Sequence, residues 1–315
     1  MTDPAKAAIV TSGDIRSRLK EGMARLRAAQ VPSHTLAAEV LLLHVLGRNR
    51  TWLYTHSEER MDAAASDRFF ALIARRAAGE PTQYLTGRQE FWGLEFEVTP
   101  AVLIPRPETE HVVEVALERL GSRGIEVDMT TGAPSPALRV ADIGTGSGCL
   151  AVALARELPH AVVFASDISA AALEVARRNA ARHGVSDRIH FLKTNLLDDL
   201  LHESGITGRE SGLLDLIVSN PPYVARDDLE RLKPEVREHE PRAALIGGET
   251  GVEIYARLIE QAARWLAPGG ILVLELGYGA ADRVRGMLQA QPDWTNVSTT
   301  DDLAGIPRVL AAEHV

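Results

Sequence analysis

The fold is decided by the stretch Asp142-Ile143-Gly144-Thr145-Gly146-Ser147-Gly148, which joins a strand-like pattern to a helical one. A glycine-rich turn at the carboxyl end of a strand is where open α/β sheets bind ligands. Gly144 and Gly146 permit a tight turn and a close approach to the ligand, and Gly148 permits close helix packing. The amides at the start of the following helix attract negative or electron-rich groups. We therefore predict a cofactor-binding loop at residues 144–148.

A carboxylate follows at the end of the next predicted strand. Asp167 ends the run at residues 161–167 and is placed to accept hydrogen bonds from two ribose hydroxyls. A nicotinamide dinucleotide fits the same pattern, and an ordinary structural turn is a further alternative. The Gly-x-Gly-x-Gly spacing, the acidic Asp142 before the turn and a predicted terminal hairpin instead resemble the S-adenosylmethionine-dependent methyltransferases.

Strands and helices alternate from Leu138 onward, which predicts a parallel sheet with helices on both faces. Two short extended runs near the end of the chain predict an antiparallel hairpin. The fold class is therefore α/β, a Rossmann-like methyltransferase sheet with a terminal antiparallel hairpin. The predicted strands are residues 139–143, 161–167, 189–192, 214–219 and 270–275, with the hairpin at 295–300 and 308–312.

The N-terminal part follows a different pattern. Between residues 12 and 79 apolar residues recur every three or four positions, as at Leu36, Val40, Leu43 and Leu46, which indicates helices. Period two then appears at residues 91–98, and a second apolar run at 102–104 predicts a β-hairpin.

These changes of pattern predict three parts. They are a small N-terminal helical domain for substrate recognition at residues 1–88, a β-hairpin linker at 89–105 and a catalytic domain at 106–315. Pro105-Arg106-Pro107-Glu108 opens the first catalytic helix, since proline is tolerated in a first turn. Residues 121–137 are rich in Gly, Pro, Ser and Thr and predict an exposed loop.

The predicted strand 214–219 ends in Asn220-Pro221-Pro222-Tyr223, at the same edge of the sheet as the glycine loop. Proline has no N–H, so the main chain here offers acceptors only. The Asn220 side-chain oxygen and the Pro221 carbonyl can accept both hydrogens of a planar –NH₂ group, while the Tyr223 ring lies against its flat face. An amide nitrogen is a poor nucleophile, so positioning matters most and no general base is needed before transfer. A proline-rich turn without chemistry is the alternative.

Composition narrows the class of protein. The 315 residues carry a formal net charge of −9, and no clustered basic face of the kind that grips nucleic acid is evident. Cys149 is the single cysteine and lies among small and apolar residues, which favours a buried helix position over a reactive thiol. The ten histidines have no metal-ligand spacing. No metal, direct nucleic-acid contact or membrane span is expected, and without a signal-like N-terminus the expected location is cytoplasmic.

Several motifs in combination resemble the release factor glutamine methyltransferase family. They are Pro81-Thr82-Gln83-Tyr84-Leu85-Thr86-Gly87, Glu90-Phe91-Trp92-Gly93, Leu103-Ile104-Pro105-Arg106-Pro107-Glu108-Thr109-Glu110, Asn220-Pro221-Pro222-Tyr223, Glu240-Pro241-Arg242-Ala243-Ala244-Leu245 and Gly305-Ile306-Pro307-Arg308-Val309. The resemblance implies that S-adenosylmethionine binds at Gly144, Thr145, Gly146, Ser147, Gly148 and Asp167. It implies that Asn220 to Tyr223 hold a glutamine from the Gly-Gly-Gln motif of class-one peptide chain release factors. Asn220 then lies beside both the cofactor and the substrate.

Other positions and substrates stay open at this point. Where some family members carry Asp-Trp near the adenine, this chain has Asn195-Leu196, which keeps a polar contact and loses aromatic stacking. Phe91 and Trp92 line a substrate entrance or make an interdomain contact, and Arg106 and Glu108 anchor a helix or orient a substrate loop. The alternative functions are a glutamine methyltransferase of a ribosomal protein, a nucleic-acid amino-methyltransferase and a non-catalytic binding module.

Overall fold

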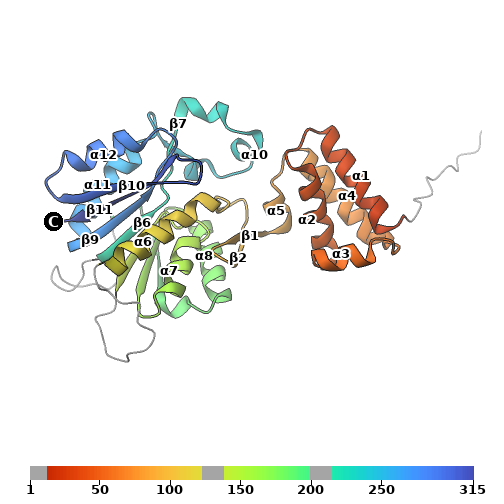
Figure 1. The fold of residues 1–315 in the computed structure, drawn as a ribbon, viewed down its shortest axis with the longest axis horizontal. Helices are drawn as coiled ribbons and strands as arrows, with labels where there is room; N and C mark the ends of the chain where they lie inside the picture. Colours follow the sequence, from red (N-terminus) through yellow and green to blue (C-terminus); the bar gives the residue numbers. More distant parts are fainter. Residues whose placement is uncertain (1–12, 123–137, 199–213) are drawn as a thin grey trace, which may run out of the picture. The chain divides into compact units, whose positions relative to one another are not determined.

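The computed structural model describes residues 13–122, 138–198 and 214–315. By contacts, the chain divides into two compact units (Figure 1). The first comprises the chain up to Gly87 together with Pro234–His239, and the second comprises Arg88–Lys233 and Glu240–Val315. The hairpin after Gly87 therefore belongs to the second unit. Most of the predicted loop, at 123–137, lies outside the described residues. Among the described helices, none is long and apolar enough to cross a membrane.

The first unit is helical, as predicted. Side chains of Asp14, Asn49 and Asp62 accept hydrogen bonds at the starts of three helices, where backbone N–H groups lack helical partners. Arg76, almost completely buried, donates to Glu235 at 2.5 Å and ties residues 234–239 to this unit. The helices are α1 (Ile15–Ala28), α2 (His34–Leu46), α3 (Arg50–His56), α4 (Ala63–Ala77), α5 (Thr82–Thr86) and α10 (Pro234–Arg237).

The apolar spacing that indicated α2 does not mark its buried face. Leu36 and Val40 are exposed, whereas Ala38, Leu41 and Leu42 are completely buried. The helix is apolar around nearly its whole circumference, so periodicity alone does not distinguish the two faces.

The second unit contains a seven-stranded sheet in the order β10-β11-β9-β6-β3-β4-β5. The five neighbouring strands from β9 to β5 run parallel, and β11 lies antiparallel between β9 and β10, which confirms the predicted class. The strands are β3 (Arg139–Ile143), β4 (Val162–Asp167), β5 (Ile189–Lys193), β6 (Leu214–Ser219), β9 (Leu266–Glu275), β10 (Trp294–Asp301) and β11 (Pro307–His314).

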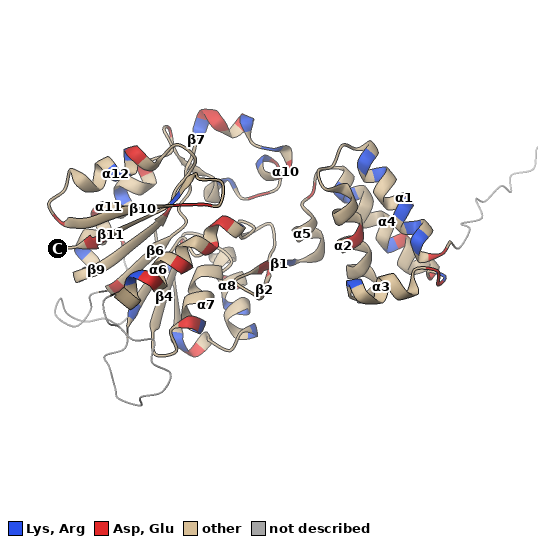
Figure 2. Cartoon of the chain, in the orientation of Figure 1, with Lys and Arg blue, Asp and Glu red and all other residues tan. Residues whose placement is uncertain are grey.

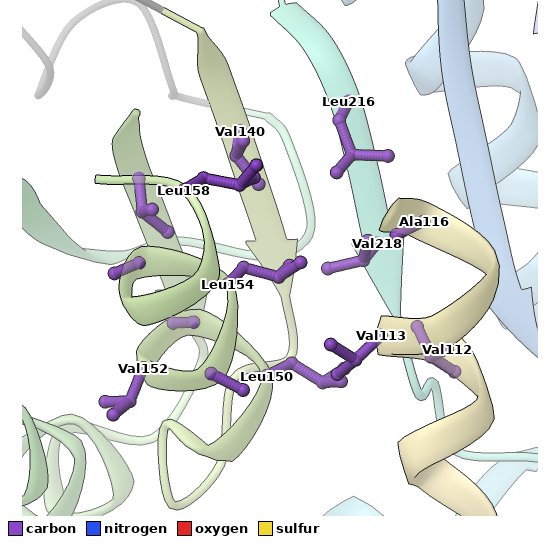
Figure 3. Close-up of a cluster of buried hydrophobic side chains, with 14 of the residues drawn as sticks. Val112, Val113, Ala116, Val140, Leu150, Val152, Leu154, Leu158, Leu216 and Val218 are labelled. Atoms are coloured by element: carbon purple, nitrogen blue, oxygen red, sulfur yellow. The ribbon is translucent and has the colours of Figure 1, made fainter. Parts of the chain in front are cut away.

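Helices cover both faces of this sheet and bury two apolar layers. On one face lie α6 (Glu110–Ser122), α7 (Cys149–Glu157) and α8 (Ala170–Arg182), and on the other α11 (Glu253–Trp265) and α12 (Ala281–Gln289). Figure 3 shows Leu150 and Leu154 of α7 meeting Val113 of α6 against Val140 and Val218 of the sheet. Short 3₁₀ turns occur at η1 (Pro107–Thr109), η2 (Ser186–Arg188), η3 (Arg226–Arg231) and η4 (Arg242–Ala244), and β7 (Val224–Ala225) pairs with β8 (Ile246–Gly248).

The predicted β-hairpin exists, but its turn was predicted in the wrong place. Strand β1 (Arg88–Phe91) pairs directly with β2 (Leu94–Glu97), and residues 102–104 form no strand. Both turn residues, Trp92 and Gly93, have positive φ angles of 55° and 67°. Such a two-residue turn matches the twist of paired strands. The period-two run therefore folds back on itself instead of pairing with the later apolar run.

Candidate active site

The glycine loop and the tetrapeptide leave the sheet side by side. Ile143 of β3 pairs with Ser219 of the neighbouring β6, so Gly144 and Asn220 follow from adjacent strand ends. The Ser219 hydroxyl donates to the Ile143 carbonyl at 2.6 Å and fixes this pairing. The chain runs from β3 outward to β5 and then returns to β6 on the other side of β3. This reversal of strand order is the place where open α/β sheets bind ligands.

The glycine loop adopts the conformation that its sequence requires. Gly144, Gly146 and Gly148 have φ angles of 74°, 55° and 82°, in the left-handed region that favours glycine. A side chain on Gly144 would meet nothing within 4 Å, so this part of the loop faces open space. A Cβ on Gly148 would lie 3.0 Å from the Cβ of Ala176, which explains the close packing of α7 against α8.

The buried carboxylate of Asp142 supports the glycine loop through hydrogen bonds. Asp142 is 1% exposed, and its Oδ2 accepts from the Thr145 hydroxyl at 2.6 Å and from the Ala151 amide at 3.0 Å. Its Oδ1 has no hydrogen-bond partner. Burial raises the pKa of Asp142 to about 7, and the nearby charge of Asp167 adds to the rise. Thr145 and Ser147 are also buried, so both residues belong to the support of the loop.

Asp167 lies at the end of β4 beside the loop. Its Oδ2 accepts from the Gly146 amide at 3.0 Å, and its Oδ1 accepts from the Ser169 amide at 2.8 Å. Partial burial raises its pKa, although these backbone hydrogen bonds oppose the rise. The carboxylate therefore shapes the loop in addition to any contact with ribose.

Asn195 and Leu196, the predicted residues near the adenine, follow β5. Asn195 is exposed, and Leu196 has a φ of 57° while its carbonyl accepts from the Ser166 hydroxyl at 3.2 Å. Ile168, which follows Asp167, is 54% exposed and was not predicted as a site residue. It offers an apolar surface next to the carboxylate, and a single apolar residue after a strand is no signal of a binding site in a sequence.

Three glycines hold the tetrapeptide. A Cβ on Gly247 would lie 2.5 Å from the Pro222 carbonyl oxygen, and one on Gly251 would lie 2.5 Å from the Tyr223 carbonyl oxygen. A Cβ on Gly277 would lie 2.7 Å from the Tyr223 ring.

The Asn220 amide donates through Nδ2 to the Thr109 hydroxyl at 3.1 Å, so Oδ1 is the end left to accept. Burial raises the pKa of Tyr223 to about 12, which keeps its hydroxyl neutral.

The helix-start motif anchors the same region. Arg106 forms an ion pair with the buried Glu240, which also accepts from the Ile104 amide at 3.2 Å. Of the two predicted roles for Arg106, the structure supports anchoring. The link joins two motifs that are more than a hundred residues apart in the sequence.

The predicted role of Phe91 at a substrate entrance is wrong. Its side chain is completely buried and forms an edge-on pair with Phe96 inside the second unit. The Trp92 indole N–H donates to Glu157 at 2.8 Å, and its backbone N–H donates to Glu110 at 2.8 Å. Both aromatic residues therefore stabilise the hairpin against the catalytic unit. Cys149 is buried as predicted, and burial raises its thiol pKa to about 12.

Sequence reasoning missed three polar residues of the site. Thr109, Glu240 and Glu275 are all 5% exposed or less. Burial raises the pKa of Glu275 to about 7, whereas a hydrogen bond from the Thr109 hydroxyl lowers it. These three residues are recognised by their burial, and a sequence does not show which polar side chains are buried. Among the described residues, no three His, Cys, Asp or Glu side chains gather as a metal ion would require.

Comparisons with known proteins identify the class of the fold. Residues 18–87 match the model of the PrmC N-terminal domain, and residues 128–234 match that of the methyltransferase small domain. The catalytic domain of hMettl16 in complex with MAT2A 3′UTR hairpin 6 has a TM-score of 0.53 at 20% identity, over 76% of this chain and 81% of that one. The second unit is thus an S-adenosylmethionine-dependent methyltransferase fold.

Sequence relatives define the family more closely. The release factor glutamine methyltransferase of Koribacter versatilis is 42% identical over 296 residues, which cover 94% of this chain and 97% of that protein. That of Geobacter sulfurreducens is 44% identical over 280 residues, 89% of each chain. The chain belongs to the release factor glutamine methyltransferase family, and its cofactor is S-adenosylmethionine. The open space over Gly144 and the support of the loop by the buried Asp142 fit this cofactor.

Proposed function

We propose that this chain methylates the side-chain amide nitrogen of the glutamine in the Gly-Gly-Gln motif of class-one peptide chain release factors. One observation carries the proposal: Asn220-Pro221-Pro222-Tyr223 follows β6 directly beside the end of β3, which carries the cofactor loop. An acceptor-lined tetrapeptide and a methyl-donor loop at neighbouring strand ends suit a planar –NH₂ group. The names of the relatives support glutamine as that group.

S-adenosylmethionine, when bound, supplies an electrophilic methyl group. Gly144 to Gly148 and Asp167 would hold it, with Asn195, Leu196 and the exposed Ile168 beside its adenosine part. In this assignment Asp167 accepts from the ribose hydroxyls, and the glycines of the loop let the cofactor approach the main chain closely.

The tetrapeptide binds and orients the substrate. Asn220 Oδ1 and the Pro221 carbonyl accept the two N–H groups of the glutamine amide, because Nδ2 of Asn220 is engaged by Thr109. These acceptors strengthen their interaction as the nitrogen becomes cationic, so they stabilise the transition state more than the bound substrate. The proton can leave after the methyl group has arrived, so no side chain is required as a base before transfer.

Two glycines before the target glutamine suit such a site. Glycine has no Cβ and adopts unusual backbone angles readily, so a Gly-Gly-Gln loop can enter a slot too narrow for bulkier residues. The separate helical unit, with its PrmC N-terminal domain match, would contact the body of the release factor. Binding energy from that contact should make an intact factor a much better substrate than a short peptide. Because the proposed substrate acts in translation, we place the reaction in the cytoplasm.

The competing substrates are a ribosomal-protein glutamine and an amino group of a nucleic acid. The net charge of −9 disfavours a nucleic acid, and Figure 2 shows acidic and basic residues mixed along the helices of the second unit. The test offers purified release factor, ribosomal protein and duplex DNA in parallel with labelled cofactor. Label in the release factor, lost when its Gly-Gly-Gln glutamine is replaced by alanine, is the expected result. Label only in DNA or ribosomal protein would reject the substrate and leave the methyltransferase assignment standing.

The tetrapeptide has its own test. Asn220→Ala should abolish transfer while cofactor affinity, measured by calorimetry, changes little, because the side chain is assigned to the substrate amide. Turnover close to that of the natural protein would contradict this assignment.

A further inference from the structure

The Asn220 side chain must be held in one of two orientations. Its amide has an acceptor end, Oδ1, and a donor end, Nδ2, which exchange places when the group turns over. Only Oδ1 can accept from a substrate –NH₂ group. In the structure Nδ2 donates to the Thr109 hydroxyl at 3.1 Å. The neighbour of Thr109 decides whether this orientation is stable.

Thr109 is the last residue of η1, is 2% exposed and has a single hydroxyl hydrogen. The Thr109 side chain lowers the pKa of the Glu275 carboxylate as a donor would, so we assign its hydrogen to that carboxylate. A hydroxyl oxygen whose hydrogen is already donated can only accept from other groups. It therefore accepts from Asn220, and this selects Nδ2 as the end that faces Thr109.

Glu275 occupies a costly position for a carboxylate. It is 2% exposed, and its Oε2 has no hydrogen-bond partner. Burial of such a group is unfavourable unless paired or hydrogen-bonded groups compensate for it. Glu275 ends β9, the neighbour of β6, and Leu274 pairs with Ser219, so Glu275 and Asn220 come next on the two strands. The carboxylate thus lies where it can control the orientation of Asn220.

We infer that Thr109 and Glu275 are positioning residues for methyl transfer, which hold the Asn220 carbonyl oxygen toward the substrate amide through a chain of hydrogen bonds. The inference rests on the proposed role of the tetrapeptide. Neither residue contacts the substrate, and no covalent bond to either is made or broken. Both act only through the Asn220 amide.

The charge of Glu275 decides which group donates and which accepts at each hydrogen bond between Glu275, Thr109 and Asn220. A protonated Glu275 would donate to the Thr109 oxygen, and the Thr109 hydrogen would then face Asn220 and favour Oδ1 at that position. Arg308 and Arg106 favour the ionised carboxylate, while Glu108 favours the protonated form. The other titratable groups that interact with Glu275 are Tyr223, Tyr255 and Cys149. Turnover should therefore fall on the acid side as Glu275 gains its proton.

The kinetic test compares Thr109→Val, which removes the hydroxyl at nearly constant volume, with Thr109→Ser, which keeps it. With intact release factor, Thr109→Val should lower kcat by up to about 100-fold at an unchanged cofactor Kd, since misplacement of a group that orients the substrate by about 1 Å can cost this much. Thr109→Ser should restore most of the lost turnover. Glu275→Gln should remove the acid limb of the kcat profile. The inference would be overturned if Thr109→Val kept the turnover of the natural protein or if Thr109→Val and Thr109→Ser lost equal turnover. It would also be overturned if Glu275→Gln kept the acid limb of the kcat profile.

A spectroscopic measurement decides the inference without turnover. The Asn220 side-chain NH₂ signal is identified in ¹⁵N-labelled protein by its loss in Asn220→Ala. It should move as pH crosses the Glu275 pKa of about 7 and should stay fixed over this range in Glu275→Gln. A signal that moves alike in both proteins, or in neither, would reject the chain of hydrogen bonds. Failure of the natural protein to label release factor would instead reject the substrate, and this signal would still decide the orientation of Asn220.

Discussion

The Tyr223 ring packs so closely against Gly277 that a side chain at position 277 should displace it. An alanine at position 277 would place its Cβ 2.7 Å from Cδ2, 2.8 Å from Cγ and 3.1 Å from Cβ of Tyr223. Gly277 does not have a positive φ, so alanine is compatible with the backbone there and the effect is steric. The main chain of Tyr223 is itself confined, because Gly251 lies against its carbonyl oxygen. The ring must therefore be displaced.

The size of the effect follows from these distances. Carbon atoms in contact lie about 3.5–4.0 Å apart, so the ring has to move by about 1 Å. A displacement of this size in a group that orients a substrate costs about 100-fold in rate. This corresponds to about 2.7 kcal/mol of transition-state stabilisation. Cofactor binding should change little, since the glycine loop is carried by β3 and not by β9.

The assay measures kcat with intact release factor, cofactor Kd by calorimetry and Tm for Gly277→Ala. Gly286→Ala on α12 is a matched control, because a Cβ there meets nothing within 4 Å and alanine favours a helix. We expect the control to keep its turnover and Gly277→Ala to lose it at nearly constant Kd. Full turnover in Gly277→Ala would show that the position of the Tyr223 ring is not important for transfer. An equal loss of cofactor affinity would show that the site collapses as a whole.

Three further predictions concern the cofactor, the substrate and pH. Asp167→Ala should weaken S-adenosylmethionine binding by calorimetry about 10- to 100-fold, since a hydrogen bond to a charged group contributes about 1.5–3 kcal/mol; unchanged affinity would remove Asp167 from the site. Tyr223→Ala should lower kcat strongly and Tyr223→Phe only mildly if the ring face makes the contact, so equal losses would assign the role to the hydroxyl. Burial raises the pKa of Asp142 and Glu275 to about 7 from 3.8 and 4.5, so the folded protein holds these protons more tightly than the unfolded chain. The unfolding free energy of the cofactor-free protein should therefore fall from about pH 4 to pH 7, by at most about 1.4 kcal/mol per pH unit and group. Urea unfolding should show a smaller fall in Asp142→Asn, and an identical fall would mean that Asp142 stays ionised in the folded protein.

The sheet was predictable because its signals are local. Each parallel strand is a short apolar run followed by a turn, and the glycine loop marks the first of them. The first hairpin was misplaced for a physical reason, because apolar alternation predicts strands but not which strands pair. The start of β9 at Leu266 was missed, since Pro268, Gly269 and Gly270 interrupt its apolar pattern.

The parts of the site that depend on one strand end were also predictable. Asp167 and Asn220 each follow an apolar run directly, so their place at the edge of the sheet can be deduced from the sequence. The contacts that support them could not, because they join distant segments. The hydrogen bond from Asn220 to Thr109 spans 111 positions, and the ion pair from Arg106 to Glu240 spans 134.

These long-range contacts give a physical meaning to motifs that carry no chemistry of their own. Arg106 binds Glu240 and so fixes the segment that enters η1, while Thr109 at its end binds Asn220. A helix start, a loop motif and the end of β9 therefore act on a single amide group. A substrate nitrogen with little nucleophilicity depends on orientation for its rate, so an enzyme of this class gains more from residues that orient one side chain than from an additional base.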